Sequence, residues 1–151
     1  MGTDDVVQAG QAVEGLLQRF FGSVSFDGAP APDYEAVCAL FLAGGLLITT
    51  STGTPQVASV REFIDSRQRM VDSGELTAFA EWERSGITEV FGNVAHRLST
   101  YGKRGTRNGA DFDGAGVIST QFVATPDGWR MSAMAWDDER AGLEIPERYR
   151  P

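Results

Sequence analysis

The chain has one cysteine and one histidine among its 151 residues. Because Cys38 has no second thiol to pair with, no internal disulfide can form, and nothing in the sequence points to an oxidising compartment. Cys38 lies in the apolar run YEAVCALFLAGGLLI, which favours a small buried side chain over a nucleophile paired with His96.

Positive charge and long hydrophobic runs are also scarce. Arginine and lysine number 13 against 21 acidic residues, so the net charge is −8, and Lys103 is the only lysine. An acidic chain without a basic stripe is a poor candidate for binding nucleic acid or an anionic membrane. The run LFLAGGLLI is too short to span a bilayer, and the acidic start MGTDDVVQAG does not resemble a signal peptide. We therefore expect a cytoplasmic protein.

Motifs for phosphate and metal binding are absent too. No glycine-rich phosphate loop or spaced set of metal ligands occurs. The stretch DFDG at 111–114 begins like a calcium loop but lacks the later ligands. The acids in WDDE at 136–139 alternate in direction along a strand, so they do not converge on an ion. We expect no metal and no cofactor.

Helical patterns fill the first half of the chain. Apolar residues recur at helical spacing from Thr3 to Gly22, and Asp33 can cap a second helix over residues 34–42. Ser59 and Glu62 form a capping box for a third helix that ends at residues 73–74. One face of this third helix carries Val60, Phe63, Ile64, Arg67, Met70 and Val71.

Strand patterns fill the rest. The run GGLLITTS at 44–51 is apolar and β-branched, and long polar–apolar alternations follow residue 74. The stretches RSG, GKRGTRNG and TPDG are expected to be turns. Helices followed by strands predict an α+β fold, with three amino-terminal helices packed on a strongly curved antiparallel sheet. We expect one domain over residues 1–140 and a tail over 141–151.

Two strand sequences carry a family resemblance. FGNVAHRLSTY at 91–101 and DGWRMSAMAWDDE at 127–139 resemble strands of the nuclear transport factor 2-like superfamily, the cystatin-like α+β cone that includes ketosteroid isomerases and SnoaL-like polyketide cyclases. The resemblance covers roughly residues 5–140 and is closest to uncharacterised small bacterial members. It implies a pocket between helices and sheet. It does not imply one activity, because this fold hosts isomerases, dehydratases, hydrolases and non-catalytic binders.

The catalytic groups of the family's enzymes do not map onto this chain. Ketosteroid isomerases use an aspartate base, but the strand at 44–51 carries no carboxylate. The scytalone dehydratase type uses two histidines, and this chain has one. Polyketide cyclases often carry a histidine on the last strand, where Ala135 stands here.

His96 is the best candidate for a catalytic group. In the predicted strand 90–101 the even-numbered residues are the more apolar set, so we expect them to face the cone interior, with the His96 ring in the pocket. A neutral imidazole there could accept a proton or bind a polar ligand group. The alternative is a histidine bonded to a neighbouring hydroxyl or backbone group.

Other polar and aromatic side chains could complete a ligand site. Glu81 and Glu83 share one face, which is either solvated or concave; in the second case they would meet His96. Further candidates offer hydrogen bonds or ring surfaces. The full set of expected ligand-binding residues is His96, Tyr101, Glu81, Ser119, Gln121 and Trp136.

The sequence supports three functional hypotheses. The first is a cone that binds a small, mainly hydrophobic molecule between helices and sheet. The second is a proton-transfer enzyme, an isomerase, dehydratase or cyclase, that uses His96 with Glu81 or Tyr101. The third is an interaction module that uses the sheet face. Apolar residues on both sheet faces also predict a homodimer through the sheets.

Overall fold

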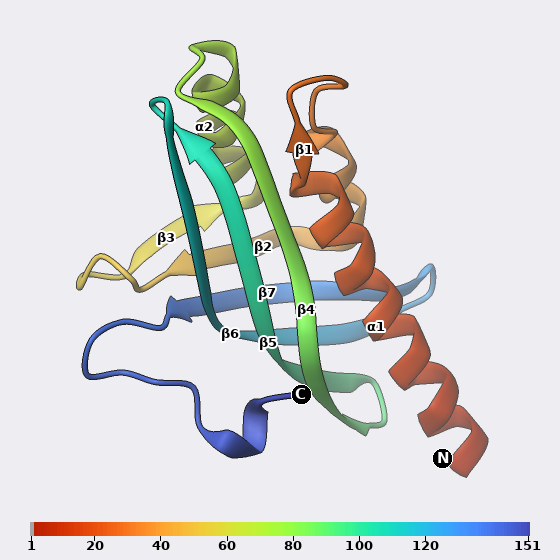
Figure 1. Ribbon diagram of the computed structural model, residues 1–151. Coiled ribbons are helices and arrows are strands. Elements are labelled where there is room, and N and C mark those ends of the chain that lie inside the picture. Colours follow the sequence, from red (N-terminus) through yellow and green to blue (C-terminus); the bar gives the residue numbers. More distant parts are fainter. Residues whose placement is uncertain (1) are drawn as a thin grey trace.

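Helices and a seven-stranded sheet make up the structure, a computed structural model that describes residues 2–151. The helices are α1 (Thr3–Val24), the 3₁₀ helix η1 (Tyr34–Leu40), α2 (Val60–Asp72) and the 3₁₀ helix η2 (Glu147–Tyr149). The strands are β1 (Phe26–Asp27), β2 (Phe41–Thr49), β3 (Gln56–Ser59), β4 (Leu76–Phe91), β5 (Val94–Arg107), β6 (Ala110–Thr125) and β7 (Gly128–Asp138) (Figure 1).

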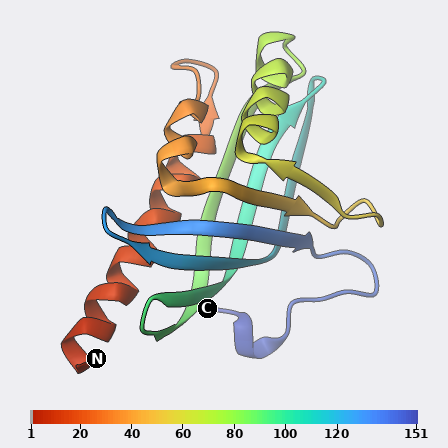
Figure 2. The same ribbon diagram turned by 180° about the vertical axis from the view of Figure 1, so that it is seen from behind.

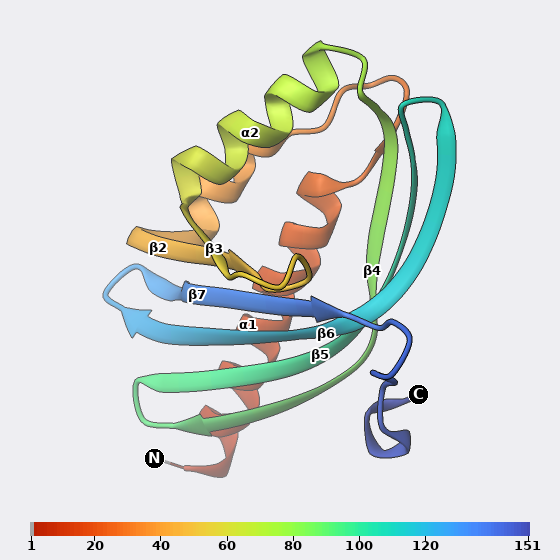
Figure 3. The ribbon, with the colours of Figure 1, turned by 90° about the vertical axis from the view of Figure 1, so that its left-hand side faces the viewer.

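The sheet has the order β1-β4-β5-β6-β7-β2-β3. Strands β4 to β7 pair antiparallel, as predicted, whereas β2 pairs parallel with β7, so the sheet is mixed. Figure 2 shows β2 and β7 side by side. Bulges at Glu83/Ser85 and Gln121/Phe122 interrupt the register, and such bulges bend strands. The sheet is strongly curved as a result (Figure 3).

Helices α1, η1 and α2 occupy the concave side of this sheet (Figure 3). Helix α1 buries one stripe of apolar residues, as its periodicity predicted, and it extends to Val24 rather than ending at Gly22. The Ser59–Glu62 capping box of α2 is present, because the Glu62 amide donates to Ser59 Oγ over 3.1 Å and the Ser59 amide donates to Glu62 Oε1 over 3.4 Å. The core lies between these helices and the inner face of β4–β7.

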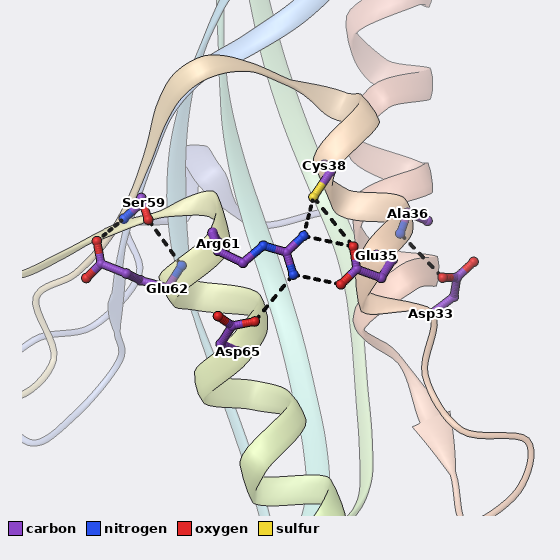
Figure 4. A network of polar contacts seen from close by, with 8 residues as sticks. All are labelled: Asp33, Glu35, Ala36, Cys38, Ser59, Arg61, Glu62 and Asp65. Atoms are coloured by element: carbon purple, nitrogen blue, oxygen red, sulfur yellow. Dashed lines mark hydrogen bonds and ion pairs between the residues drawn. The ribbon is translucent and has the colours of Figure 1, made fainter.

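The second predicted helix is the 3₁₀ helix η1, and the strand after it begins at Phe41 rather than Gly44. Arg61 of α2 binds the Glu35 carboxylate of η1 through two hydrogen bonds of 2.7 and 2.9 Å (Figure 4). The same guanidinium lies 3.4 Å from the Cys38 thiol. The prediction that Cys38 is buried is therefore wrong, because the tighter turn of η1 places this side chain outward.

The turn that joins β4 to β5 also differs from the prediction. RSG at 84–86 lies within β4, where a bulge interrupts the register, and the turn falls at Gly92 and Asn93. Gly92 has φ +56, a conformation that glycine adopts without strain. The predicted turns within GKRGTRNG and TPDG are confirmed at 108–109 and 126–127.

The C-terminal segment packs on the convex face of the sheet, here called the outer face (Figure 3). The Tyr149 carbonyl accepts hydrogen bonds from Ser85 Oγ over 2.6 Å and from Thr100 Oγ1 over 2.5 Å. Ile145 is buried. The domain boundary between residues 140 and 141 stays a prediction. Within residues 2–151, none of the helices has the length and apolar character needed to cross a bilayer.

Candidate functional site

A cavity of about 450 Å³ lies between the helices and the concave face of the sheet. Aromatic and aliphatic side chains from α1, η1, α2 and β4–β7 make up most of its wall. Phe63 and Trp136 meet there edge to face, with ring centroids 6.4 Å apart. The apolar lining is Phe20, Val24, Tyr34, Phe63, Met70, Leu76, Phe79, Tyr101, Ala110, Phe112, Ile118, Met134 and Trp136.

The turn between β5 and β6 forms the mouth of this cavity. Asn108, Ala110 and Asp111 line the cavity and are exposed to solvent. Arg107 stands beside them, and its Nη2 lies 2.6 Å from the Glu75 carboxylate, which ties β5 to the connection between α2 and β4. The buried lining residues mark the opposite, inner end.

Glu81 of β4 is the acidic group inside the cavity. Among residues 2–151, no side chain makes a hydrogen bond or ion pair with its carboxylate. Burial raises the pKa of Glu81 to about 7, and the nearby charges of Lys103 and Arg67 only partly offset that rise. The group can therefore hold or release a proton near neutral pH.

Arg67 of α2 is a cationic group inside the cavity. Its guanidinium lies over the Phe63 ring, 5.2 Å from the centroid. Burial lowers the pKa of Arg67, although the group keeps its charge at neutral pH. Tyr34 of η1 lines the same cavity, and burial raises the pKa of its phenol against the opposing charge of Arg67.

Tyr101, Asp138 and Lys103 form a polar network in the wall. The Tyr101 hydroxyl donates to the Asp138 carboxylate, which also accepts a hydrogen bond of 2.7 Å from Lys103 Nζ. Burial opposes the charged form of Asp138, but the hydrogen bonds from Lys103 and Tyr101 outweigh it and lower the pKa of that carboxyl. Gly116 permits this arrangement, because a Cβ at that position would collide with the Tyr101 hydroxyl.

The structure divides the six predicted ligand-binding residues into two groups of three. Glu81, Tyr101 and Trp136 line the cavity and come together from β4, β5 and β7. The other three, His96, Ser119 and Gln121, lie on the outer face.

The prediction that His96 faces the cone interior is wrong. Its side chain is 58% exposed, and its Nε2 lies 3.1 Å from Glu89 Oε1 on the outer face. The prediction assumed that the more apolar, even-numbered residues of β5 face the interior. In the structure these residues face outward, and the residues that face inward include the buried Arg97 and Ser99. A proton-transfer role for His96 in the cavity is therefore excluded by position.

Glu81 and Glu83 both face the interior, so a solvated face is not their setting. Glu83 lies beside the cavity rather than in its lining, and it binds Arg97 through hydrogen bonds of 2.9 and 2.6 Å. Neither glutamate meets His96. Trp82, between them, points outward and is partly exposed.

Several polar residues of this site were not predicted from the sequence, among them Arg67, Lys103, Asp138 and Tyr34. One signal was available, because Arg67 lies within the apolar stripe of α2, and a charged residue in such a stripe faces the interior. Lys103 and Asp138 carried no such signal, since their meeting depends on the pairing of β5 with β6 and of β6 with β7.

Metal ligation has no support in the described part of the chain. No group of three or more histidine, cysteine, aspartate or glutamate side chains within residues 2–151 could hold an ion. What the cavity offers is an apolar enclosure with a few polar groups, which is the usual make-up of a small-molecule site.

The fold and this cavity define an α+β cone with an interior pocket. No family model and no curated protein matches the sequence. Solved structures do match. A nuclear transport factor 2-like superfamily protein from Salmonella enterica serovar Typhimurium shares 16% identity over 93% of this chain and 98% of its own, with a TM-score of 0.73.

Two further solved structures agree. A nuclear transport factor 2-like protein with a cystatin-like fold from Novosphingobium aromaticivorans is 15% identical over 95% of this chain and 87% of its own, with a TM-score of 0.68. A candidate dehydratase of the same family from Streptomyces avermitilis is 14% identical over 87% and 97%, also with a TM-score of 0.68.

The chain thus has the cystatin-like fold of the nuclear transport factor 2-like superfamily, as the sequence resemblance predicted. At such identities the likeness is one of fold, and it carries no ligand or activity over to this chain. The narrower SnoaL-like assignment stays a prediction.

Proposed function

We propose that the protein binds a small, mainly apolar molecule in the cavity between helices and sheet. The observation that carries this proposal is the enclosure itself: about 450 Å³, walled mainly by aromatic and aliphatic side chains. This volume is within the range of ligand pockets, roughly 300–1,000 Å³. The few polar groups, Glu81 and Arg67 among them, would orient the bound molecule.

Binding can be tested with the neutral fluorescent probe N-phenyl-1-naphthylamine. We expect a saturable rise in fluorescence with one site per chain. Ala110→Trp, which places an indole at the mouth, should weaken binding on the order of tenfold or more. Ala141→Trp is the matched control, because Ala141 is exposed in the C-terminal segment, away from the cavity lining. The proposal fails if binding does not saturate or if both variants bind alike.

A second candidate function is proton transfer by Glu81, in place of the His96 role expected from sequence. The specific observation is a carboxyl group without a side-chain partner in the lining of a mainly apolar cavity, where burial raises its pKa to about 7. A general base works best when its pKa is near the operating pH. The Streptomyces avermitilis neighbour, a candidate dehydratase, is consistent with this chemistry on this fold.

Proton transfer can be measured as deuterium exchange at the α-carbons of 2-tetralone, followed by NMR. We expect the wild type to accelerate exchange and Glu81→Gln to reduce that acceleration by about 10²–10⁴-fold. His96→Gln should have no effect, since the ring lies on the outer face. Loss of exchange in His96→Gln, or full activity in Glu81→Gln, would contradict this candidate.

The outer face supports a homodimer as the protein partner. Phe91 is 85% exposed, and Ile87, Val94 and Leu98 line a groove with it on β4 and β5. Exposed apolar patches of this kind mark interaction surfaces, and a second copy can cover such a face with the same face of its own. The cytoplasmic location expected from the sequence also stays a prediction.

Light scattering should give twice the mass of one chain at micromolar concentration. Phe91→Glu should give the mass of one chain, because it places a charge in the centre of the proposed interface. Val57→Glu is the control, since Val57 is also exposed but lies on β3 at the far edge of the sheet. A wild-type mass of one chain would refute the dimer.

A further inference from the structure

Arg67, which lines the cavity, differs from four other arginines that are held by ion pairs. Arg61, Arg97, Arg107 and Arg140 each have a carboxylate oxygen between 2.6 and 2.7 Å away. Among residues 2–151, no carboxylate lies within ion-pair distance of Arg67. Its side chain is half-buried in the cavity wall, where burial lowers its pKa and the nearby Tyr34 and Glu81 only partly offset that effect. A partly desolvated cation without an ion-pair partner is unfavourable, and an anion in the cavity would compensate it.

The neighbouring charges leave room for one negative charge. Lys103 is paired with Asp138, and Arg107 is paired with Glu75. Two acids line the cavity without an ion pair. Asp111 is exposed at the mouth and accepts a hydrogen bond from Thr106, whereas Glu81 lies inside and makes no contact with Arg67. When Glu81 carries its proton, the interior has one cation in excess, and its carboxyl group becomes a hydrogen-bond donor.

We propose that the cavity binds an apolar molecule that ends in a carboxylate, which Arg67 holds and which accepts a hydrogen bond from the protonated Glu81. This inference rests on the proposed ligand-binding function and names the ligand class. The planar guanidinium matches a carboxylate through two parallel N–H···O bonds. The apolar body of the ligand would lie against Phe63 and Trp136, near the Arg67 side chain.

Binding of this ligand is coupled to a proton on Glu81. The charged and titratable groups nearest Glu81 are Arg67 from α2, Lys103 and Tyr101 from β5, and Asp138 from β7. The same cavity is lined by Tyr34 of η1 and, at its mouth, by Arg107 and Asp111, while α1 contributes only apolar side chains. Lys103, Tyr101 and Asp138 already bind one another, so the ligand's negative charge acts mainly on Arg67 and Glu81. Above neutral pH, the ligand must therefore enter together with a proton.

The ligand class can be tested by calorimetry with 2-naphthoate and its neutral isostere 2-naphthamide at pH 6. We expect the wild type to bind the carboxylate at least about tenfold more tightly than the amide. Arg67→Gln should abolish that preference and leave the amide affinity within about twofold. Arg69→Gln should behave as the wild type, because this substitution removes the same charge from the exposed side of the same helix.

Proton coupling is tested by measuring the binding enthalpy of 2-naphthoate at pH 8 in HEPES and in Tris. These buffers differ in ionisation enthalpy, so the difference between the two binding enthalpies gives the number of protons taken up. The wild type should take up about one proton per naphthoate bound, and Glu81→Gln should take up none. Equal wild-type affinity for naphthoate and naphthamide overturns the carboxylate inference without the need for any variant. Tighter binding of 2-naphthyl phosphate than of naphthoate overturns it as well.

These outcomes distinguish a wrong ligand class from a wrong proposal that the cavity binds a small molecule. If N-phenyl-1-naphthylamine binds but the carboxylate preference is absent, only the ligand class is wrong. If neither that probe nor either naphthalene compound binds, the proposed function and the inference both fail. A preference that persists in Arg67→Gln shows that another group recognises the carboxylate and refutes the role of Arg67.

Discussion

Replacing Glu83 with glutamine is expected to lower the free energy of unfolding by about 3–5 kcal/mol. Arg97 and Glu83 form an almost fully buried ion pair, with side-chain exposures of 9% and 7%. Arg97 Nε and Nη2 donate to the two Glu83 oxygens over 2.9 and 2.6 Å, and Ser99 Oγ donates to one of them over 2.6 Å. The substitution leaves the Arg97 charge buried without its partner.

The other acid near Arg97, Glu14, is a weaker partner than Glu83. Glu14 lies 3.7 Å from Arg97 Nη2, but its side chain is about half exposed and makes no hydrogen bond to Arg97. The Arg97 guanidinium lies directly over Gly86, where any Cβ would collide with it. The ion pair is thus part of the inner face of the sheet, beside the cavity.

Urea denaturation of purified variants measures this effect. Glu35→Gln is the matched control, because Glu35 binds Arg61 with the same paired geometry but on the surface, and its loss should leave stability nearly unchanged (Figure 4). Adding Arg97→Met to Glu83→Gln should restore most of the loss, since it removes the unpaired charge. A loss in Glu83→Gln no larger than in Glu35→Gln would contradict the prediction.

Raising the pH from about 4.5 to about 8 is expected to lower the stability of the ligand-free protein by about 3 kcal/mol. The cause is Glu81, whose ordinary pKa of 4.5 rises to about 7 on burial. Between these two values the folded state holds a proton that the unfolded state has released. Stability therefore falls as pH rises across this window, and the full penalty is present above the folded value.

Two other carboxyl groups, those of Glu83 and Asp138, make the folded protein less stable as the pH falls. The pKa values of Glu83 and Asp138 are lowered, because their hydrogen bonds outweigh the effect of burial. Their contribution is present above the ordinary carboxyl value and is lost as pH falls through the folded one. The two trends together place maximum stability on the acidic side of neutrality.

Denaturation curves at pH 5, 6, 7 and 8 measure the Glu81 effect. Glu81→Gln should flatten the dependence above pH 5 and should be more stable than the wild type at pH 8. Glu89→Gln should keep the wild-type dependence, because Glu89 is exposed on the outer face beside His96. An unchanged pH dependence in Glu81→Gln would show that burial does not perturb this carboxyl group.

Much of the fold could be predicted from local patterns. The stripe along α1, the Ser59–Glu62 capping box and the alternation after residue 74 each depend on residues close in sequence, and each is present. The closing strand, DGWRMSAMAWDDE, supported the family resemblance, and the structure has the cystatin-like fold. Three of the expected site residues, Glu81, Tyr101 and Trp136, do line the cavity.

The errors about which side chains face the cavity have a common physical origin. Strand alternation gives two faces but does not say which of them is inside, and a bulge such as that at Glu83/Ser85 exchanges them. Apolarity was the guide to the inner face of β5, and it was wrong there. The charge of Arg97 can be buried on the inner face because Glu83 forms an ion pair with it. The outer face, by contrast, carries exposed apolar side chains around Phe91.

The sequence by itself determined the three amino-terminal helices, the strand-rich second half and the class of fold, because helical period, capping and strand alternation are short-range properties. Only the tertiary structure decided that His96 lies outside, that Arg67 and Glu81 share one cavity, and that Asp138 joins Tyr101 and Lys103. Those facts depend on strand register, a bulge and the packing of α2 over the sheet, which bring together residues far apart in the chain.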